Sequence, residues 1–154
     1  FGFLFMPFFF KENKKAYIFA WLGAICIFLS TIFYAMVGLT PGDLYFNAHV
    51  FAVFTAFRLT LPGVLFLMLA FYFSKASNIY TIGAFLLLAS VVAYIIFMGD
   101  MPQIDPINDR ENFVRFVSMD VLMLNVILQK LIVIAMLVSM FMFTFGFQKL
   151  KQLS

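Results

Sequence analysis

Charged residues are scarce in this sequence. Asp, Glu, Lys and Arg make up 11% of the 154 residues, whereas hydrophobic residues make up 65%. A soluble domain typically has about 25% charged residues. A chain of this length also has too little interior to hide so much apolar surface from water. The scarcity of charge therefore excludes an ordinary soluble domain and favours an integral membrane protein.

Cysteine and histidine are almost absent as well, with one of each, Cys26 and His49. A lone cysteine excludes an intrachain disulfide. A catalytic zinc usually takes three protein ligands, often several histidines, so one histidine argues against a multi-histidine hydrolase. We find no Ser-His-Asp set at meaningful spacing, no phosphate-cradling loop and no nucleic-acid patch. We therefore predict no metal, no cofactor and no nucleic-acid partner, and we favour a non-enzymatic protein over an enzyme.

Long apolar stretches dominate what the sequence does contain. They cover residues 16–37, 48–73, 79–98 and 117–147. A helix crosses the hydrocarbon core with about 20 residues, so each stretch predicts one span. The last stretch is longer than a perpendicular crossing requires, so it must tilt or project beyond the core. We find no linker or internal repeat, and we predict a single transmembrane domain over residues 1–154: an all-α helical bundle with four complete spans.

The apolar segment 1–10 is too short to span, and Lys11 follows it at once. A signal peptide would carry its positive charge before the apolar run rather than after it. We interpret the segment as the end of an earlier helix that arrives at the cytoplasm. A short segment lying in the membrane interface is the alternative.

Charge alternates between the connections. Lysines lie in 11–15, at Lys75 and in the C-terminal tail, whereas carboxylates gather in the connections 39–47 and 99–116. Because basic residues are enriched on the cytoplasmic side of membrane proteins, the pattern predicts a cytoplasmic C-terminus. The acidic connections then face outward. The charge pattern does not identify which membrane the protein occupies.

Two cations interrupt the apolar stretches. Arg58 lies 15 residues before Phe73, and Lys130 lies 17 residues before Phe147. At about 1.5 Å per residue, both are about 22–26 Å from the cytoplasmic edge and therefore in the outer leaflet. Ionisable groups inside a membrane are rare and often functional. Pro62 interrupts the helix at the same position. Because proline has no N–H, the Arg58 carbonyl lacks its helical hydrogen-bond partner.

Neutral polar side chains are also concentrated in the outer halves of the spans. Asn125 and Gln129 are four residues apart and therefore share a helix face, and Tyr94 lies in the outer half of the third span. We predict an outward-opening polar pocket that binds a lipid head group or a small anion. The predicted ligand-binding residues are Arg58, Lys130, Asn125, Gln129 and Tyr94.

Two alternatives stay open. Arg58 and Lys130 could instead extend to the outer interface, or pair with Asp120 and the loop acids as structural contacts. The second function class is an accessory or structural subunit of a larger membrane complex, in which the polar groups bond neighbouring helices. The predicted partners are accordingly membrane lipids or other membrane subunits.

The run from Val37 to Asp43, Val-Gly-Leu-Thr-Pro-Gly-Asp, is followed by Ala48 and His49. This pattern resembles the DRAM/FRAG/SFK-like group of small multispan membrane proteins, over about a dozen residues from Gly38 to His49. The resemblance implies about six helices and a trafficking or lipid-related role without established chemistry. It points to Pro41, Asp43 and His49 as a structural motif of the outer face.

Overall fold

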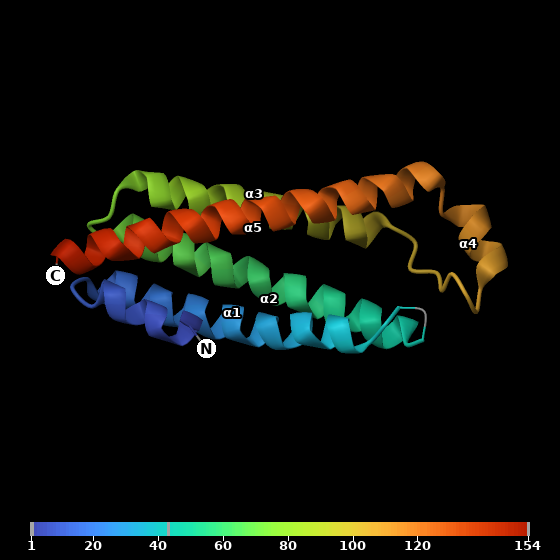
Figure 1. Cartoon of the computed structure of the whole chain (residues 1–154), viewed down its shortest axis with the longest axis horizontal. Coiled ribbons are helices and arrows are strands. Elements are labelled where there is room, and N and C mark those ends of the chain that lie inside the picture. Colours follow the sequence, from blue (N-terminus) through green and yellow to red (C-terminus); the bar gives the residue numbers. More distant parts are fainter. Residues whose placement is uncertain (1, 43, 154) are drawn as a thin grey trace.

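The computed structural model describes residues 2–42 and 44–153, and within these ranges the chain is helical with no strand (Figure 1). Four helices are long and apolar enough to cross a membrane. The prediction of an all-α bundle with four spans is confirmed, and the chain is an integral membrane protein. The elements in chain order are η1 (Gly2–Phe10), α1 (Lys14–Leu39), α2 (Phe46–Phe73), α3 (Asn78–Asp100), α4 (Arg110–Phe116) and α5 (Met119–Leu153).

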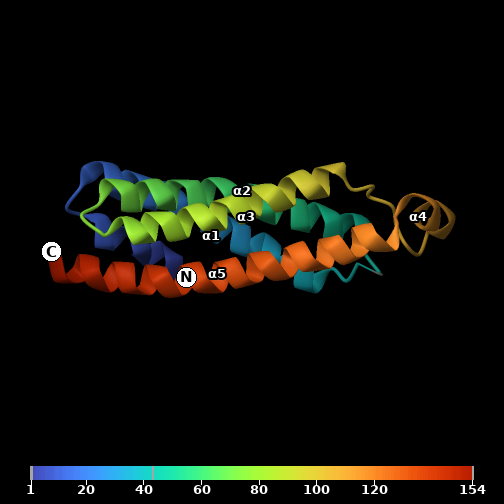
Figure 2. The ribbon, with the colours of Figure 1, turned by 90° about the horizontal axis from the view of Figure 1, so that it is seen from above.

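The bundle has two chemically different ends. The short helix α4 lies beyond the ends of α2 and α3 in both views, and we call this the α4 end (Figures 1 and 2). The opposite end holds the turns around Lys11 and Lys75 together with the C-terminal turns of α5, and we call it the lysine end. With 35 residues, α5 is about 52 Å long, and it runs obliquely along the whole bundle (Figure 1).

The long helices pack mainly with their neighbours in the chain, α1 with α2, α2 with α3, and α3 with α5. The α1–α2 pair is the closest because both helices present small residues to each other. Ala16, Ala20 and Ala24 of α1 are fully buried, as are Ala52 and Ala56 of α2. Small side chains at a spacing of four let two membrane helices approach closely.

The first element, η1, runs lengthwise beside α1 and also touches α5 (Figure 1). Met6 and Phe10 are buried against this pair. The Phe10 ring meets the rings of Phe71 and Phe147 at centroid distances of 5.2 and 6.0 Å. η1 therefore closes the bundle on one side near the lysine end, and it leads into the N-terminus of α1 through the turn at Asn13.

Candidate functional site

A cavity of about 260 Å³ lies at the α4 end, enclosed by parts of the chain that are far apart in sequence. The N-terminal turns of α2 form one wall and the last turns of α3 another. The third wall is α5 over its first turns, and the connection between α3 and α4 forms the roof. The cavity thus exists because α5 returns beside α3 while the intervening connection folds across the gap.

The polar floor of the cavity is made by Tyr94 of α3 and by Asn125 and Gln129 of α5. Gln129 Nε2 donates to Tyr94 Oη at 3.0 Å and to Asn125 Oδ1 at 3.4 Å. Tyr94 is 1% exposed, and its ring packs on Phe57 with a centroid distance of 4.6 Å. The three polar side chains are therefore positioned by one another and by the α2–α3 contact.

The amide side chains of the floor offer further hydrogen-bonding groups. An Asn or Gln amide offers two N–H donors and one carbonyl acceptor. Within residues 2–42 and 44–153, Asn125 Nδ2 donates no hydrogen bond and Gln129 Oε1 accepts none. Both groups can therefore serve a small polar ligand in the cavity.

The roof is held by local hydrogen bonds rather than by packing. Gln103 Nε2 donates to the carbonyl oxygens of Met98 and Met101, at 3.3 and 2.9 Å. These bonds satisfy carbonyls at the C-terminus of α3 and turn the chain back over the cavity. Phe113 of α4 reaches the cavity, but no residue of α4 is buried.

Asp105 organises the turn at the far end of the roof. Its carboxylate accepts from the backbone N–H groups of Ile107 and Asn108 at 2.8 and 3.0 Å, and from the Asn108 side chain at 2.8 Å. The backbone N–H of Asn108 is the main cause that lowers the pKa of the Asp105 carboxyl, followed by the Asn108 amide and the N–H of Ile107. Hydrogen bonds to the charged form favour that form.

His49 connects the α1–α2 turn to the cavity wall. Its Nδ1 donates to the carbonyl oxygen of Thr40 at 2.6 Å. The ring lies over Gly42, where an added Cβ would sit 3.7 Å from the ring. The Pro41 carbonyl accepts from the backbone N–H of Tyr45 at 2.8 Å. Pro41 and His49 thus belong to one hydrogen-bonded turn, while Asp43 lies outside the described residues.

The two predicted cations lie elsewhere. Arg58 and Lys130 are both exposed and neither lines the cavity. The Arg58 guanidinium is 5.4 Å from the centre of the Phe54 ring. Lys130 shares the exposed face of α5 with Val126 and Val133, at the helical spacing of three and four residues.

Asp120 is also exposed, and it lies ten residues from Lys130, about 15 Å along α5. In the part of the chain that the structure describes, no ion pair involves Arg58, Lys130 or Asp120. The predicted ligand-binding set therefore divides: Tyr94, Asn125 and Gln129 meet at one cavity, and the two cations are exposed on the outside of the bundle.

Sequence reasoning did not identify Gln103 as part of this site, nor His49 as part of its wall. Gln103 lies in an irregular connection, where no periodic pattern marks a side chain as inward-facing. The sequence places His49 at the outer end of the second span, but its contact with the cavity depends on how α2 is rotated against α3.

Comparison with protein-family models, with curated protein sequences and with solved structures gives no match for this chain. The fold and the cavity alone therefore define its class, a multispan α-helical membrane protein. The resemblance to the DRAM/FRAG/SFK-like group stays a prediction that rests on the residues around Pro41 and His49.

Proposed function

We propose that this chain is a non-enzymatic multispan membrane protein that binds a lipid head group or a small anion in the cavity at the α4 end. One observation carries the proposal: polar side chains of two helices, Tyr94 of α3 with Asn125 and Gln129 of α5, meet at a roofed cavity and keep unused hydrogen-bonding groups. Gln129 is exposed and Asn125 is half-buried, and polar groups gain from a hydrogen-bonding partner where a membrane excludes water. A ligand that bonds Asn125 Nδ2 and Gln129 Oε1 supplies that partner.

The cavity size limits the ligand. Small-molecule sites commonly have about 300–1,000 Å³, and this cavity has about 260 Å³. It suits a head group or a small anion rather than a whole lipid, and the acyl chains of a bound lipid would stay in the bilayer.

Arg58 and Lys130 act from outside the cavity. Both lie at a similar depth in the predicted outer leaflet, with exposed side chains. Long basic side chains extend toward the interface, where they meet lipid phosphates. Arginine bonds such groups bidentately. The two cations thus concentrate anionic head groups near the α4 end, while the uncharged floor of the cavity provides the specific contacts.

The orientation follows from the lysine end. Lys11, Lys14 and Lys75 gather there, and basic residues favour the cytoplasmic side. In this orientation the C-terminus is cytoplasmic, and the cavity opens toward the outside.

The proposal is tested by lipid retention. The full chain is purified in mild detergent from vesicles of phosphatidylcholine with added phosphatidylglycerol, and bound lipid is counted by native mass spectrometry. We expect Gln129→Leu to lower phosphatidylglycerol retention about 2–10-fold, the range of one or two hydrogen bonds. Ser90→Ala is the matched control, because the half-buried Ser90 does not line the cavity and its hydroxyl donates to the Leu86 carbonyl of its own helix. Equal retention in both variants contradicts the proposal.

A second candidate is an accessory subunit of a larger membrane complex. The observation in its favour is that α5 packs on α3 and η1 and leaves Lys130 exposed, without an ion pair to any described residue. A partner helix with a carboxylate at that depth would pair with Lys130. Isolation only together with another polypeptide, lost in Lys130→Leu, would support this candidate over the first.

A further inference from the structure

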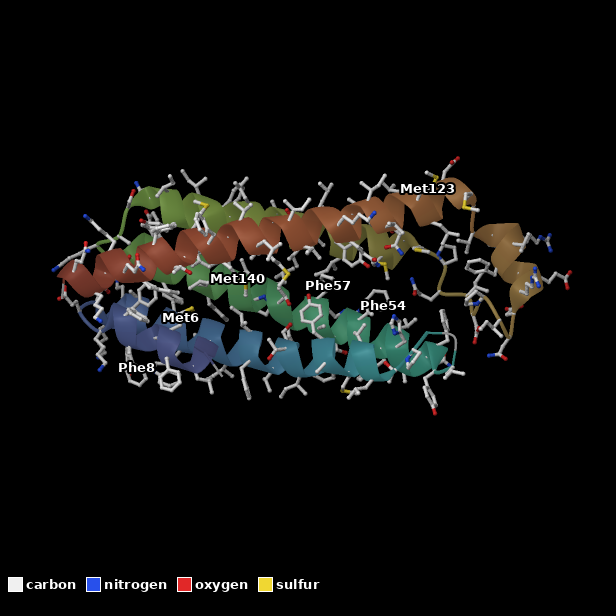
Figure 3. All side chains as sticks on the ribbon, viewed as in Figure 1. Met6, Phe8, Phe54, Phe57, Met123 and Met140 are labelled. Atoms are coloured by element: carbon white, nitrogen blue, oxygen red, sulfur yellow. The ribbon has the colours of Figure 1, made fainter. Side chains whose placement is uncertain are left out.

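A second and larger cavity, of about 560 Å³, opens halfway along the bundle. It lies between α1 and α5, which do not form a packed pair, and α2 and α3 provide its floor. η1 closes it toward the lysine end through Met6 and Phe9. In Figure 3, Met6 lies on η1 and Met140 on the side of α5 that faces it. We call this space the membrane cleft, and it is separate from the cavity at the α4 end.

The membrane cleft is amphipathic and uncharged. Among the described residues, its lining contains no Asp, Glu, Lys, Arg or His. Hydroxyl groups of Ser30, Tyr34 and Thr60 gather toward one end, whereas Phe143 and Phe147 line the other. The lining also includes Thr31 and Thr144, whose hydroxyls donate to the Phe28 and Met140 carbonyls of their own helices. The α5 wall from Met136 to Phe147 is about 16 Å long. An elongated molecule with one polar end matches this distribution.

The three hydroxyls form a chain that ends at the cleft. Ser30 Oγ donates to the Ala56 carbonyl at 2.8 Å and lies 2.7 Å from Thr60 Oγ1. Thr60 Oγ1 is also 2.9 Å from the Ala56 carbonyl and 3.3 Å from Tyr34 Oη. Ser30 and Thr60 are buried, so Tyr34 is the member that a ligand can reach.

Proton counting indicates which group Tyr34 would recognise. Each hydroxyl has one proton to donate and can also accept a hydrogen bond. The three hydroxyls therefore have three protons for the four contacts described above. When Thr60 donates to Tyr34, the Tyr34 proton is free for a ligand acceptor. When Tyr34 donates to Thr60, its lone pairs are free for a ligand donor. A ligand hydroxyl satisfies either arrangement, because it can both donate and accept.

The lining argues against a protein helix as the occupant. Membrane helices associate through small residues that allow close approach. Gly23 and Gly63 are used between α1 and α2, while Gly83 and Gly146 already contact Met142 and Phe71. The α5 wall of the cleft instead consists of long, adaptable side chains such as Met136 and Met140. Methionine fits irregular small-molecule shapes better than a regular helix surface.

We propose that the membrane cleft binds an uncharged membrane amphiphile, with its hydroxyl at Tyr34 and its apolar body along α5 toward η1. Sterols and diacylglycerols share this chemistry. A charged lipid is disfavoured because no side chain of the cleft would compensate its charge within the membrane.

The test uses the full chain in phosphatidylcholine vesicles that contain either a photoreactive sterol or a photoreactive diacylglycerol. Labelled peptides are located by mass spectrometry. We expect one of the probes to label α1 and α5 residues of the cleft, and excess unlabelled lipid of the same kind to abolish this labelling. The probe that labels shows whether the ligand is a sterol or a diacylglycerol. Met140→Trp, which fills the cleft, should lower this labelling at least about 5-fold. Leu137→Trp, on the exposed face of the same helix, should leave it unchanged.

Tyr34→Phe tests the hydroxyl without filling the cleft. We expect a loss of about 2–10-fold, the range for one hydrogen bond, and we expect Gln129→Leu at the separate cavity to have no effect. Labelling that does not saturate, or that is equal in Met140→Trp and Leu137→Trp, would indicate ordinary surrounding lipid and overturn the proposal. Stronger labelling by photoreactive phosphatidic acid than by both neutral probes would also overturn it.

Discussion

Gly23 of α1 and Gly63 of α2 lie in the contact between the two helices. A Cβ added at Gly23 would lie 3.0 Å from the Gly63 carbonyl oxygen and 3.2 Å from the backbone nitrogen of Leu67. Both neighbours are backbone atoms, which cannot move aside as a flexible side chain can. The absence of a side chain at Gly23 therefore sets the distance between α1 and α2.

We expect Gly23→Ala to destabilise the fold. Overpacking a close contact costs about 1–3 kcal/mol, which outweighs the gain in helix propensity of up to about 1 kcal/mol. Gly38→Ala is the matched control, because a Cβ placed there meets no packing neighbour among the described residues within 4 Å. Thermal unfolding in detergent should give a lower midpoint for Gly23→Ala than for Gly38→Ala. The reverse order would show that the helices can separate without cost.

Asn13 connects two helix ends, and its variants should separate the two contacts. Its Oδ1 accepts from the backbone N–H groups of Lys15 and Ala16 at 3.0 and 3.2 Å, and its Nδ2 donates to the Phe73 carbonyl at 2.7 Å. Asn13→Ala removes both contacts and should cost about 1–2 kcal/mol.

Asn13→Asp keeps the acceptor at the N-terminus of α1 but loses the donor to Phe73. We therefore expect a smaller loss of unfolding free energy than for Asn13→Ala, measured in the same detergent. An equal loss in both variants would mean that the cap of α1 contributes nothing to stability. Glu12→Gln controls for local charge, because its exposed ion pair with Lys75 is worth at most about 1 kcal/mol.

The roof of the cavity should respond to acid through Asp105. The pKa of the Asp105 carboxyl is lowered in the folded state. Its contribution to the stability of the turn is therefore present above the pKa of the unfolded chain, about 3.9. That contribution is lost as the pH falls through the lower folded value. Amide hydrogen exchange at Ile107 and Asn108, corrected for intrinsic rates, should accelerate over that acidic range. In Asp105→Asn this acceleration should be absent, and an unchanged pH profile in the variant would assign it to another group.

The orientation across the membrane can be tested with single cysteines. After Cys26→Ala, Asn108→Cys reports on the α4 end and Ser77→Cys on the lysine end. In intact cells that carry the chain in the plasma membrane, a membrane-impermeant maleimide should label Asn108→Cys at once, and Ser77→Cys only after permeabilisation. The opposite pattern would reverse the predicted topology and place the cavity at the cytoplasmic face.

The small-residue contact between α1 and α2 has a recognisable sequence pattern. Ala16, Ala20 and Ala24 recur every four residues, and Ala52, Ala56 and Thr60 do the same. This spacing places each set on one helix face and is typical of close membrane-helix pairs. It could have predicted which faces of these two helices meet, and with them the burial of Ser30 and Thr60.

Part of the polar site could also be inferred. Asn125 and Gln129 share a face because they are four residues apart, and residue counting placed them in the same half of the membrane as Tyr94. The structure brings these three side chains to one cavity. Counting did not predict that Arg58 and Lys130 point away from it, because depth along a helix says nothing about the direction in which a side chain points.

The four spans and the all-helical class follow from the amino-acid sequence, because a bilayer has a set thickness and leaves no water to satisfy an open backbone. Which faces meet, where the two cavities lie and which polar groups line them depend on tertiary packing. The spans are apolar on nearly every side. Hydropathy therefore cannot mark an inward face, and packing of small residues and a few hydrogen bonds sets the rotation of each helix.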